Sequence, residues 1–206
     1  MDKIEDQFAA KCKERSDINE HLPTLRRYAK ECETICEMGV RGIVSTWALL
    51  AGLMDSEHQN KRMVCVDIVD TNMDSIRDIA RKVGINVMFM KGDSATLDLP
   101  LERTDMLFID TWHVYGHLKR ELIKHHAKVN KYIVMHDTEI DKIHGESLRN
   151  RENIPLQSKQ TGYPEEEIAC GLEKAIEEFL IEHENKWAIH ERFTNNNGLT
   201  ILKRII

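Results

Sequence analysis

Acidic residues follow, one after another, the short apolar segments of this 206-residue sequence. Carboxylates can bind a divalent cation, accept hydrogen bonds from ligand hydroxyls or, beside a histidine, take part in acid–base catalysis. If the apolar segments are parallel strands of one sheet, these acids lie together at its carboxyl edge, where ligands bind in such folds. The acids are Glu37, Asp67, Asp93, Asp110 and Asp137.

Two histidines stand close to the last two of these acids. His113 follows Asp110 by three residues, and His136 directly precedes Asp137. A neutral imidazole can act as a general base near neutral pH or bind a transition metal. The plainer alternatives are a solvent-facing histidine for His113 and a helix N-cap for Asp110. Asp137 follows a buried apolar segment, so its carboxylate needs a partner, a cap or a metal.

A glycine-containing turn follows the first apolar segment. Residues Glu37-Met38-Gly39-Val40-Arg41-Gly42 lead into a helix start at Ser45. Glycines let the backbone turn tightly and approach a ligand, although similar turns occur in many folds of this class without that role. A nicotinamide dinucleotide favours G-x-G-x-x-G, which is absent, and Glu37 would repel its pyrophosphate. A cationic cofactor suits the turn better, and Arg41 is a candidate partner either for an acidic side chain or for a cofactor carboxylate.

Short apolar runs alternate with amphipathic stretches along most of the chain. The amphipathic stretches have apolar residues at helical spacing, as in the stripe of Met73, Ile76 and Ala80. This alternation predicts an α/β fold with a doubly wound, mostly parallel seven-stranded sheet and a C-terminal antiparallel hairpin. The predicted strands are 34–39, 62–67, 85–90, 105–110 and 131–137, and the predicted hairpin is 186–193 with 198–205.

Two segments lie outside this pattern. Residues 16–33 are expected to form an N-terminal helix, with a cap at Ser16–Asn19 and Pro23 in the first turn. Residues 138–164 are polar and aperiodic, and unusually long for a connection. They are either a lid over the site or a disordered insertion. We expect one domain over residues 1–206.

The composition narrows the class of protein. A net charge of −6 disfavours binding to nucleic acid, and no apolar run is long enough to cross a membrane. The five cysteines form no C-x-x-C pair and are typical of reduced thiols. We expect a soluble, cytoplasmic protein with small-molecule partners, and assembly into a homo-oligomer stays open.

Three of these features together resemble the class I S-adenosylmethionine-dependent methyltransferases. They are the turn at Gly39, the Asp67 that closes the second strand, and Gly92-Asp93-Ser94 after the third, and the similarity spans residues 16–206. The resemblance implies a Rossmann-like methyltransferase fold and S-adenosyl-L-methionine as cofactor. It implies that Gly39 and its neighbours lie near the methionine part, Asp67 at the ribose, and Asp93 with Ser94 at the adenine. The cofactor-binding set is then Glu37, Gly39, Arg41, Ser45, Asp67, Asp93, Ser94 and Asp110.

Within that family, Asp110-Thr111-Trp112-His113 and His136-Asp137 resemble one subgroup, the metal-dependent sugar O-methyltransferases and their relative cephalosporin hydroxylase. The resemblance implies that Asp110 and Asp137 bind a divalent metal, Mg²⁺ or Mn²⁺, and that His113 is the general base. His136 stands where the subgroup often has an acid. As a ligand it would favour a metal softer than Mg²⁺, and the alternative is that it only supports the ligands.

We therefore expect an O-methyltransferase that acts on a hydroxyl of a sugar or related small molecule, with His113 and Asp110 as catalytic residues. The alternatives are a cofactor-binding relative with hydroxylase-like chemistry and a noncatalytic role. Trp112 and Tyr115 are expected either to line a sugar site or to pack in the core. The pair His125-His126 is expected to be a solvated helix end.

Overall fold

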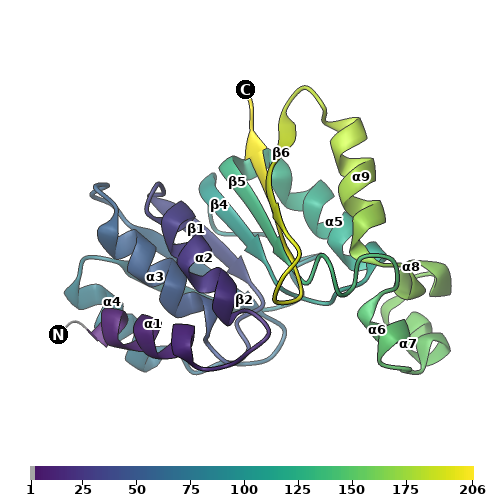
Figure 1. Cartoon of the computed structure of the whole chain (residues 1–206), viewed down its shortest axis with the longest axis horizontal. Helices are drawn as coiled ribbons and strands as arrows, with labels where there is room; N and C mark the ends of the chain where they lie inside the picture. The colour runs from purple at the N-terminus through teal and green to yellow at the C-terminus, as the bar shows by residue number, and fades with distance from the viewer. Residues whose placement is uncertain (1–2) are drawn as a thin grey trace.

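The computed structural model describes residues 3–206, which fold around a seven-stranded sheet (Figure 1). The first five strands are parallel, and β7 runs antiparallel to both β5 and β6. The strand order is β3-β2-β1-β4-β5-β7-β6, so the predicted doubly wound sheet with a C-terminal antiparallel hairpin is confirmed. The strands are β1 (Thr34–Met38), β2 (Arg62–Asp67), β3 (Asn86–Lys91), β4 (Thr104–Ile109), β5 (Val129–His136), β6 (Trp187–Phe193) and β7 (Leu199–Arg204).

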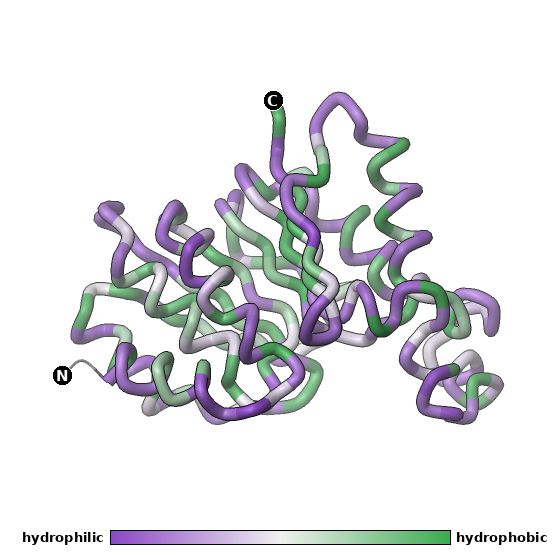
Figure 2. Tube along the Cα trace, viewed as in Figure 1, coloured by the Kyte–Doolittle hydropathy of each residue, from purple (hydrophilic) through white to green (hydrophobic). Residues whose placement is uncertain are grey.

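Helices cover both faces of the sheet, because its strands present apolar side chains on both sides (Figures 1 and 2). Successive residues of a strand point to opposite faces, so Ile35 packs in the core on one face and Cys36 in the core on the other. The first face carries α1 (Lys3–Lys13), α2 (Leu22–Ala29), α3 (Ser45–Asp55) and α4 (Asp74–Lys82), and the second carries α5 (Tyr115–His125) and α9 (Leu172–Glu182).

The direction in which successive strands are added to the sheet reverses at β1. From β1 the chain proceeds outward to β2 and β3, then returns to place β4 on the other side of β1. Connections leave in opposite directions at such a point, which leaves a crevice at the carboxyl ends of the strands. The predicted acids therefore share one edge of the sheet.

The N-terminal region differs from the prediction of a helix over 16–33. Residues Asn19–His21 form a 3₁₀ turn, and α2 begins at Leu22 and ends at Ala29. Pro23 occupies the first turn of α2, where a missing N–H costs no hydrogen bond. Residues 3–13, for which the sequence pattern predicts no helix, form α1, because Ile4 and Phe8 share one helix face and are buried.

The segment 138–164 contains helices, although its sequence shows no sustained helical period. Short helices of this kind bury too few residues to leave a clear apolar stripe. They gather beside one end of the sheet, at the lower right of Figure 1. They are α6 (Glu146–Arg149) and α7 (Ile154–Thr161), followed by α8 (Glu165–Ala169). Elsewhere, between α5 and β5, a 3₁₀ turn spans His126–Lys128.

Among residues 3–206, no helix has both the length and the apolar character needed to cross a bilayer.

Candidate active site

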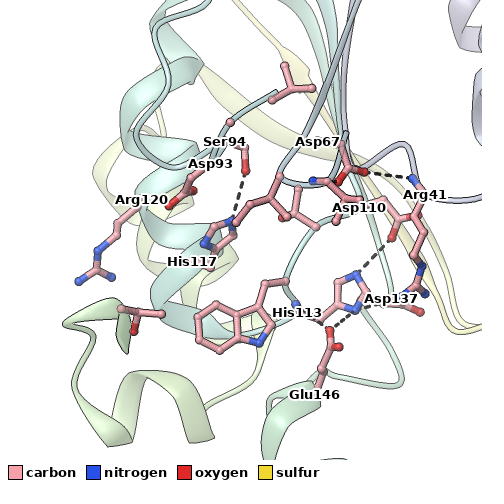
Figure 3. Close-up of a pocket in the computed structure, with 18 of the residues that line it drawn as sticks. Arg41, Asp67, Asp93, Ser94, Asp110, His113, His117, Arg120, Asp137 and Glu146 are labelled. Carbon is pink, nitrogen blue, oxygen red and sulfur yellow. Dashed lines mark hydrogen bonds and ion pairs between the residues drawn. The ribbon is translucent and has the colours of Figure 1, made fainter. Parts of the chain in front are cut away.

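A cavity of about 860 Å³ opens at the carboxyl ends of the parallel strands (Figure 3). The loops that follow β1 to β5 contribute to its wall, together with the start of α5 and the segment containing α6 and α7. All predicted site residues line it except Glu37 and His136. The edge location predicted from the sequence thus matches the main cavity of the described chain.

Gly39 lies directly against the backbone of Asp110, the residue that follows β4. Its φ is +88°, in the left-handed region, and a Cβ here would lie 1.8 Å from the backbone oxygen of Asp110. Any side chain would therefore displace the end of β4. The glycine lets the turn after β1 pass the end of β4 and lets its backbone approach a ligand in the cavity.

Glu37 lies beneath this turn rather than on the cavity wall. Its side chain is fully buried and accepts hydrogen bonds from Ser45 Oγ at 2.6 Å and Thr46 Oγ1 at 2.8 Å. Burial raises the pKa of Glu37 to about 7, although these hydrogen bonds oppose the rise. Glu37 therefore fixes the start of α3 against β1, and only Ser45 reaches the cavity.

Asp67 lies on the cavity wall and holds the glycine turn in place. Its Oδ2 accepts from the backbone N–H groups of Val40, at 2.8 Å, and Arg41, at 3.1 Å, while Oδ1 accepts from Val69 N–H at 2.8 Å. Each carboxylate oxygen has two lone pairs, so a ligand hydroxyl can still be accepted. The side chain of Arg41 also lines the cavity.

After β3, Asp93 and Ser94 both line the cavity. Ser94 Oγ donates to Glu121 at 2.5 Å and lies 3.2 Å from His117 Nε2. The sequence reasoning missed His117 and Glu121, whose spacing of four residues on α5 is the signal that they share a helix face. The expectation of a solvated His125 is wrong, because this side chain is buried with Nε2 2.7 Å from the carbonyl oxygen of Ser94.

At the ends of β4 and β5, Asp110, His113 and Asp137 converge. His113 Nε2 lies 3.2 Å from Asp110 Oδ1, and His113 Nδ1 lies 3.1 Å from Asp137 Oδ2. One ligand atom from each residue lies within 4.8 Å of the others, as binding to one metal ion requires. Asp137 has a φ of +57°, and its Oδ1 is buried with no hydrogen-bond partner.

The carboxylates around His113 shift the pKa values of the groups in this cluster. Burial disfavours the imidazolium of His113, but hydrogen bonds to Asp110, Asp141 and Glu146 outweigh it, so the pKa of His113 lies well above its ordinary value. The charged and hydrogen-bonded histidines in turn hold the pKa of Asp110 far below the usual range despite its burial. Ionised carboxylates, the form that binds metal, are thereby favoured.

His136 lies outside the converging group. Its Nδ1 is 3.3 Å from Asp110 Oδ1, and its Nε2 faces the backbone oxygens of Asp17 at 3.2 Å and Asn196 at 3.3 Å. Burial opposes the charged form, but Asp110 and Asp137 raise the pKa of His136 to about 10. Both ring nitrogens of His136 thus face acceptors, an arrangement that fits the alternative in which His136 supports Asp110.

Two further acids, unrecognised in the sequence, complete the cluster. Asp141 Oδ2 lies 3.5 Å from His113 Nδ1, and Glu146 Oε2 lies 3.0 Å from it. Asp141 is fully buried, and Arg149 donates to both of its oxygens. The only sequence signal was the four-residue spacing from Asp137 to Asp141, since Glu146 stands in the aperiodic segment.

Aromatic side chains form a further part of the wall. The rings of Trp112 and Tyr163 are stacked, with centroids 5.9 Å apart, and the guanidinium of Arg120 lies 3.9 Å from the centre of the Tyr163 ring. Trp112 therefore lines the cavity and also packs against a small hydrophobic cluster. Tyr115 instead packs in the core, with its hydroxyl donating to Glu178 at 2.7 Å.

A family model described as a methyltransferase domain matches residues 36–138. The chain belongs to this family. The match begins in β1 and ends just after Asp137, so it contains the glycine turn and the strand-end acids. The predicted enzyme class, a methyltransferase, is confirmed. Among curated proteins, no significant sequence match was found.

Solved methyltransferases share the fold at low identity. The O-methyltransferase TomG from Streptomyces achromogenes, solved in complex with SAM, is 13% identical with a TM-score of 0.55, covering 99% of this chain and 90% of that one. An O-methyltransferase from Bacillus cereus in complex with SAH is 15% identical, with a TM-score of 0.52 and coverages of 98% and 90%. Magnesium protoporphyrin IX methyltransferase from Synechocystis, with bound SAH, is 15% identical, with a TM-score of 0.54 and coverages of 97% and 92%.

Proposed function

We propose that the protein is an S-adenosylmethionine-dependent O-methyltransferase that acts on a hydroxyl of a sugar or related small molecule, with a divalent metal beside the acceptor. The observation that carries this proposal is the convergence of Asp110, His113 and Asp137 on a cavity whose other end has a glycine turn and a strand-end acid. The names of the solved relatives, several of them O-methyltransferases, support the reaction type.

The ends of β1 to β3 would bind the methyl donor. Gly39 offers close backbone approach, and Arg41, whose guanidinium lies on the same wall, would face the donor carboxylate. Asp67 retains one lone pair, on Oδ1, for a ribose hydroxyl, and Asp93 with Ser94 would lie at the adenine. Ile68 and Val69 line this part of the cavity with their side chains largely exposed, so a bound ring would cover them.

The ends of β4 and β5 fit a divalent cation. Oxygen ligands suit Mg²⁺ and Mn²⁺, and the buried, unpartnered Oδ1 of Asp137 is an acceptor that a cation would satisfy. Asp110 and Asp137 would hold the ion, with His136 supporting Asp110. When bound there, a divalent cation supplies positive charge that lowers the pKa of an acceptor hydroxyl and offsets the carboxylates that keep His113 protonated.

His113 would then accept the proton of the acceptor hydroxyl. It lies between the two candidate ligands and lines the cavity, so a hydroxyl placed beside Asp110 is within reach of its ring. The acceptor ring would lie against the face of Trp112, because apolar sugar faces stack on aromatic side chains. The segment with α7, which supplies Gln160 and Thr161 to the wall, would limit the access of water.

Location and assembly stay predictions. The five free cysteines favour the reducing cytoplasm that we propose as its location. The residues that would bind donor and metal all lie in one chain, so the proposed reaction does not require a second copy.

The test measures donor binding and methyl transfer separately. Binding of S-adenosylmethionine is measured by calorimetry, and transfer is followed by mass spectrometry with methyl glycosides as probe acceptors, in Mn²⁺, Mg²⁺ or EDTA. We expect donor binding in all three conditions and a mass gain of one methylene only with metal. Absence of donor binding would exclude the proposed reaction, and transfer that survives EDTA would exclude the metal.

A further inference from the structure

The first helix of the segment after β5 is docked directly on His113. The backbone N–H of Glu146 donates to the His113 carbonyl oxygen at 2.9 Å, and the backbone N–H of His113 donates back to Glu146 Oε2 at 3.1 Å. The same carboxylate oxygen lies 3.0 Å from His113 Nδ1. Both the backbone and the ring of His113 are therefore fixed relative to α6 (Figure 3).

A second contact ties the neighbouring residue to the same helix. Trp112 Nε1 donates to Ser147 Oγ at 3.0 Å, and Ser147 is fully buried. Two consecutive residues after β4 are thus hydrogen-bonded to α6: Trp112 to Ser147, and His113 to Glu146. The start of α6 acts as a brace for the turn that carries the candidate base.

Three carboxylates face Nδ1 of His113, and the contacts separate their roles. Asp141 is the most distant, at 3.5 Å, and both of its oxygens accept from Arg149 at the far end of α6. Asp137 belongs with Asp110 to the group proposed to hold a cation. Glu146 is the nearest of the three, at 3.0 Å, and it alone also bonds the His113 backbone.

We propose that Glu146 is a positioning residue that orients the His113 imidazole, with Nδ1 held toward α6 and Nε2 directed to Asp110 and the cavity. The proposal rests on the function proposed above, in which His113 takes the acceptor proton. The hydrogen bond at one ring nitrogen of a histidine decides which nitrogen is left for chemistry. The long segment after β5 then has a defined role, because it delivers this carboxylate.

The test compares Glu146→Gln with Glu152→Gln in the full-length protein. Glu152 belongs to the same segment, and its exposed side chain pairs with Gln157, away from His113. Nuclear magnetic resonance of ring-¹⁵N histidine reports the hydrogen bonding of Nδ1 and needs no methyl-acceptor substrate. The His113 signal is assigned by its absence in His113→Asn. We expect the His113 Nδ1 resonance to shift in Glu146→Gln and to stay in place in Glu152→Gln.

Kinetics supply the second measurement. With a methyl glycoside as probe acceptor, Glu146→Gln should lower kcat about 10- to 100-fold, the usual cost of removing a residue that orients a functional one, with the KM for S-adenosylmethionine unchanged. Unchanged kcat together with an unchanged Nδ1 resonance would overturn the proposal. Loss of Mn²⁺ binding, measured by electron paramagnetic resonance, would also overturn it, because Glu146 would then be a metal ligand with His113 and Asp141.

Two further arms keep the test decisive. If Glu146→Gln does not fold, Glu146→Asp keeps the charge on a side chain one methylene shorter, and the same shift of the Nδ1 resonance is expected. If the unmodified protein binds neither S-adenosylmethionine nor Mn²⁺, the proposed function fails. The Nδ1 resonance of His113 still tests the contact with Glu146 in that case.

Discussion

The two ends of the cavity are built by different means. At the ends of β1 to β3, the wall depends on backbone: Gly39 lets the chain pass Asp110, and Asp67 accepts from three backbone N–H groups. At the ends of β4 and β5, side chains from three separate segments meet around His113. A backbone-built site is specified locally, whereas a side-chain cluster depends on how distant segments fold.

This difference gives each end its own sensitivity. Substitutions at the donor end should act through the shape of the glycine turn and leave the proposed metal ligands in place. If the proposal holds, substitutions at the ends of β4 and β5 should abolish cation binding while the donor still binds. Gly39 is the exception, because it touches Asp110 and so belongs to both ends.

Asp137→Asn is expected to have the largest effect. Asparagine tolerates the left-handed φ of +57°, so the fold is kept while an anionic ligand is lost. Affinity for Mn²⁺ should fall by more than about 100-fold, since removing even a supporting residue costs 10- to 100-fold, and methyl transfer should cease. Calorimetry with Mn²⁺ and with S-adenosylmethionine checks both ends, and Glu139→Gln is the control two residues away. Loss of donor affinity as well would show that the ends are not separate.

Gly39→Ala should disturb both ends together. Gly84→Ala is its matched control, because Gly84 also has a left-handed φ, +76°, but a Cβ there meets nothing within 4 Å. The control should lose about 1 to 2 kcal/mol of unfolding free energy through backbone strain alone. Gly39→Ala should lose at least about 2 kcal/mol more, because its Cβ overlaps the Asp110 carbonyl. Urea unfolding measures both, and equal losses would contradict the close approach of β1 and β4.

Glu37→Gln tests the support beneath the donor end through pH. Because burial raises the pKa of Glu37 to about 7, the stability gained from its protonated form is fully present below pH 4.5 and is lost as pH rises through 7. A glutamine cannot ionise, so the variant should gain stability relative to the parent between pH 5 and pH 8. The gain should be on the order of 2 kcal/mol, and thermal unfolding across this range checks it. A difference that does not vary with pH would contradict the burial of an ionising carboxyl.

The smallest effect is expected at the amino end of β5, far from both ends of the cavity. The His126 ring stacks on His183 with centroids 4.2 Å apart, and its Nδ1 is buried without a partner. Burial, followed by the nearby His183 and Lys186, lowers the pKa of His126 to about 4. Its contribution to stability is therefore lost as pH falls from 6.5 through 4.

His126→Gln removes that titration. Because His126 is only partly buried and solvent screens its charge, the unfolding free energy of the variant should fall about 1 kcal/mol less than that of the parent between pH 7 and pH 4.5, while affinities for donor and Mn²⁺ stay unchanged. Acid unfolding monitored by circular dichroism measures the stability difference. Parallel pH profiles for the two proteins would contradict the assignment.

The sequence predicted the fold well because the fold is encoded by local periodicity. Each predicted strand forms within a few residues of its expected place, since runs such as RMVCVD are apolar on both faces and end in a polar residue. The first helix was missed because its buried face contains only Ile4 and Phe8 in an otherwise charged stretch.

The sequence predicted the part of the candidate site that lies directly after the strands. Acids at strand ends, such as Asp67 and Asp110, are recognisable from the chain alone, because every parallel strand ends at the same edge. Glu146 was not, because its role depends on the docking of α6 against residues 112 and 113, which no local pattern shows. Glu37 was placed at the edge, but its side chain points away from the cavity toward Ser45 and Thr46, which depends on the pleat of β1.

The central claim is that one cavity binds the methyl donor at one end and a divalent cation at the other. The most direct measurement is a calorimetric titration of S-adenosylmethionine into the protein and into Asp67→Ala and Asp137→Asn, each with Mn²⁺ bound or removed. We predict one donor per chain in the parent, weaker binding in Asp67→Ala, and donor binding in Asp137→Asn equal to that of the metal-free parent. Donor binding that is absent from the parent, or that survives Asp67→Ala unchanged, would contradict the account.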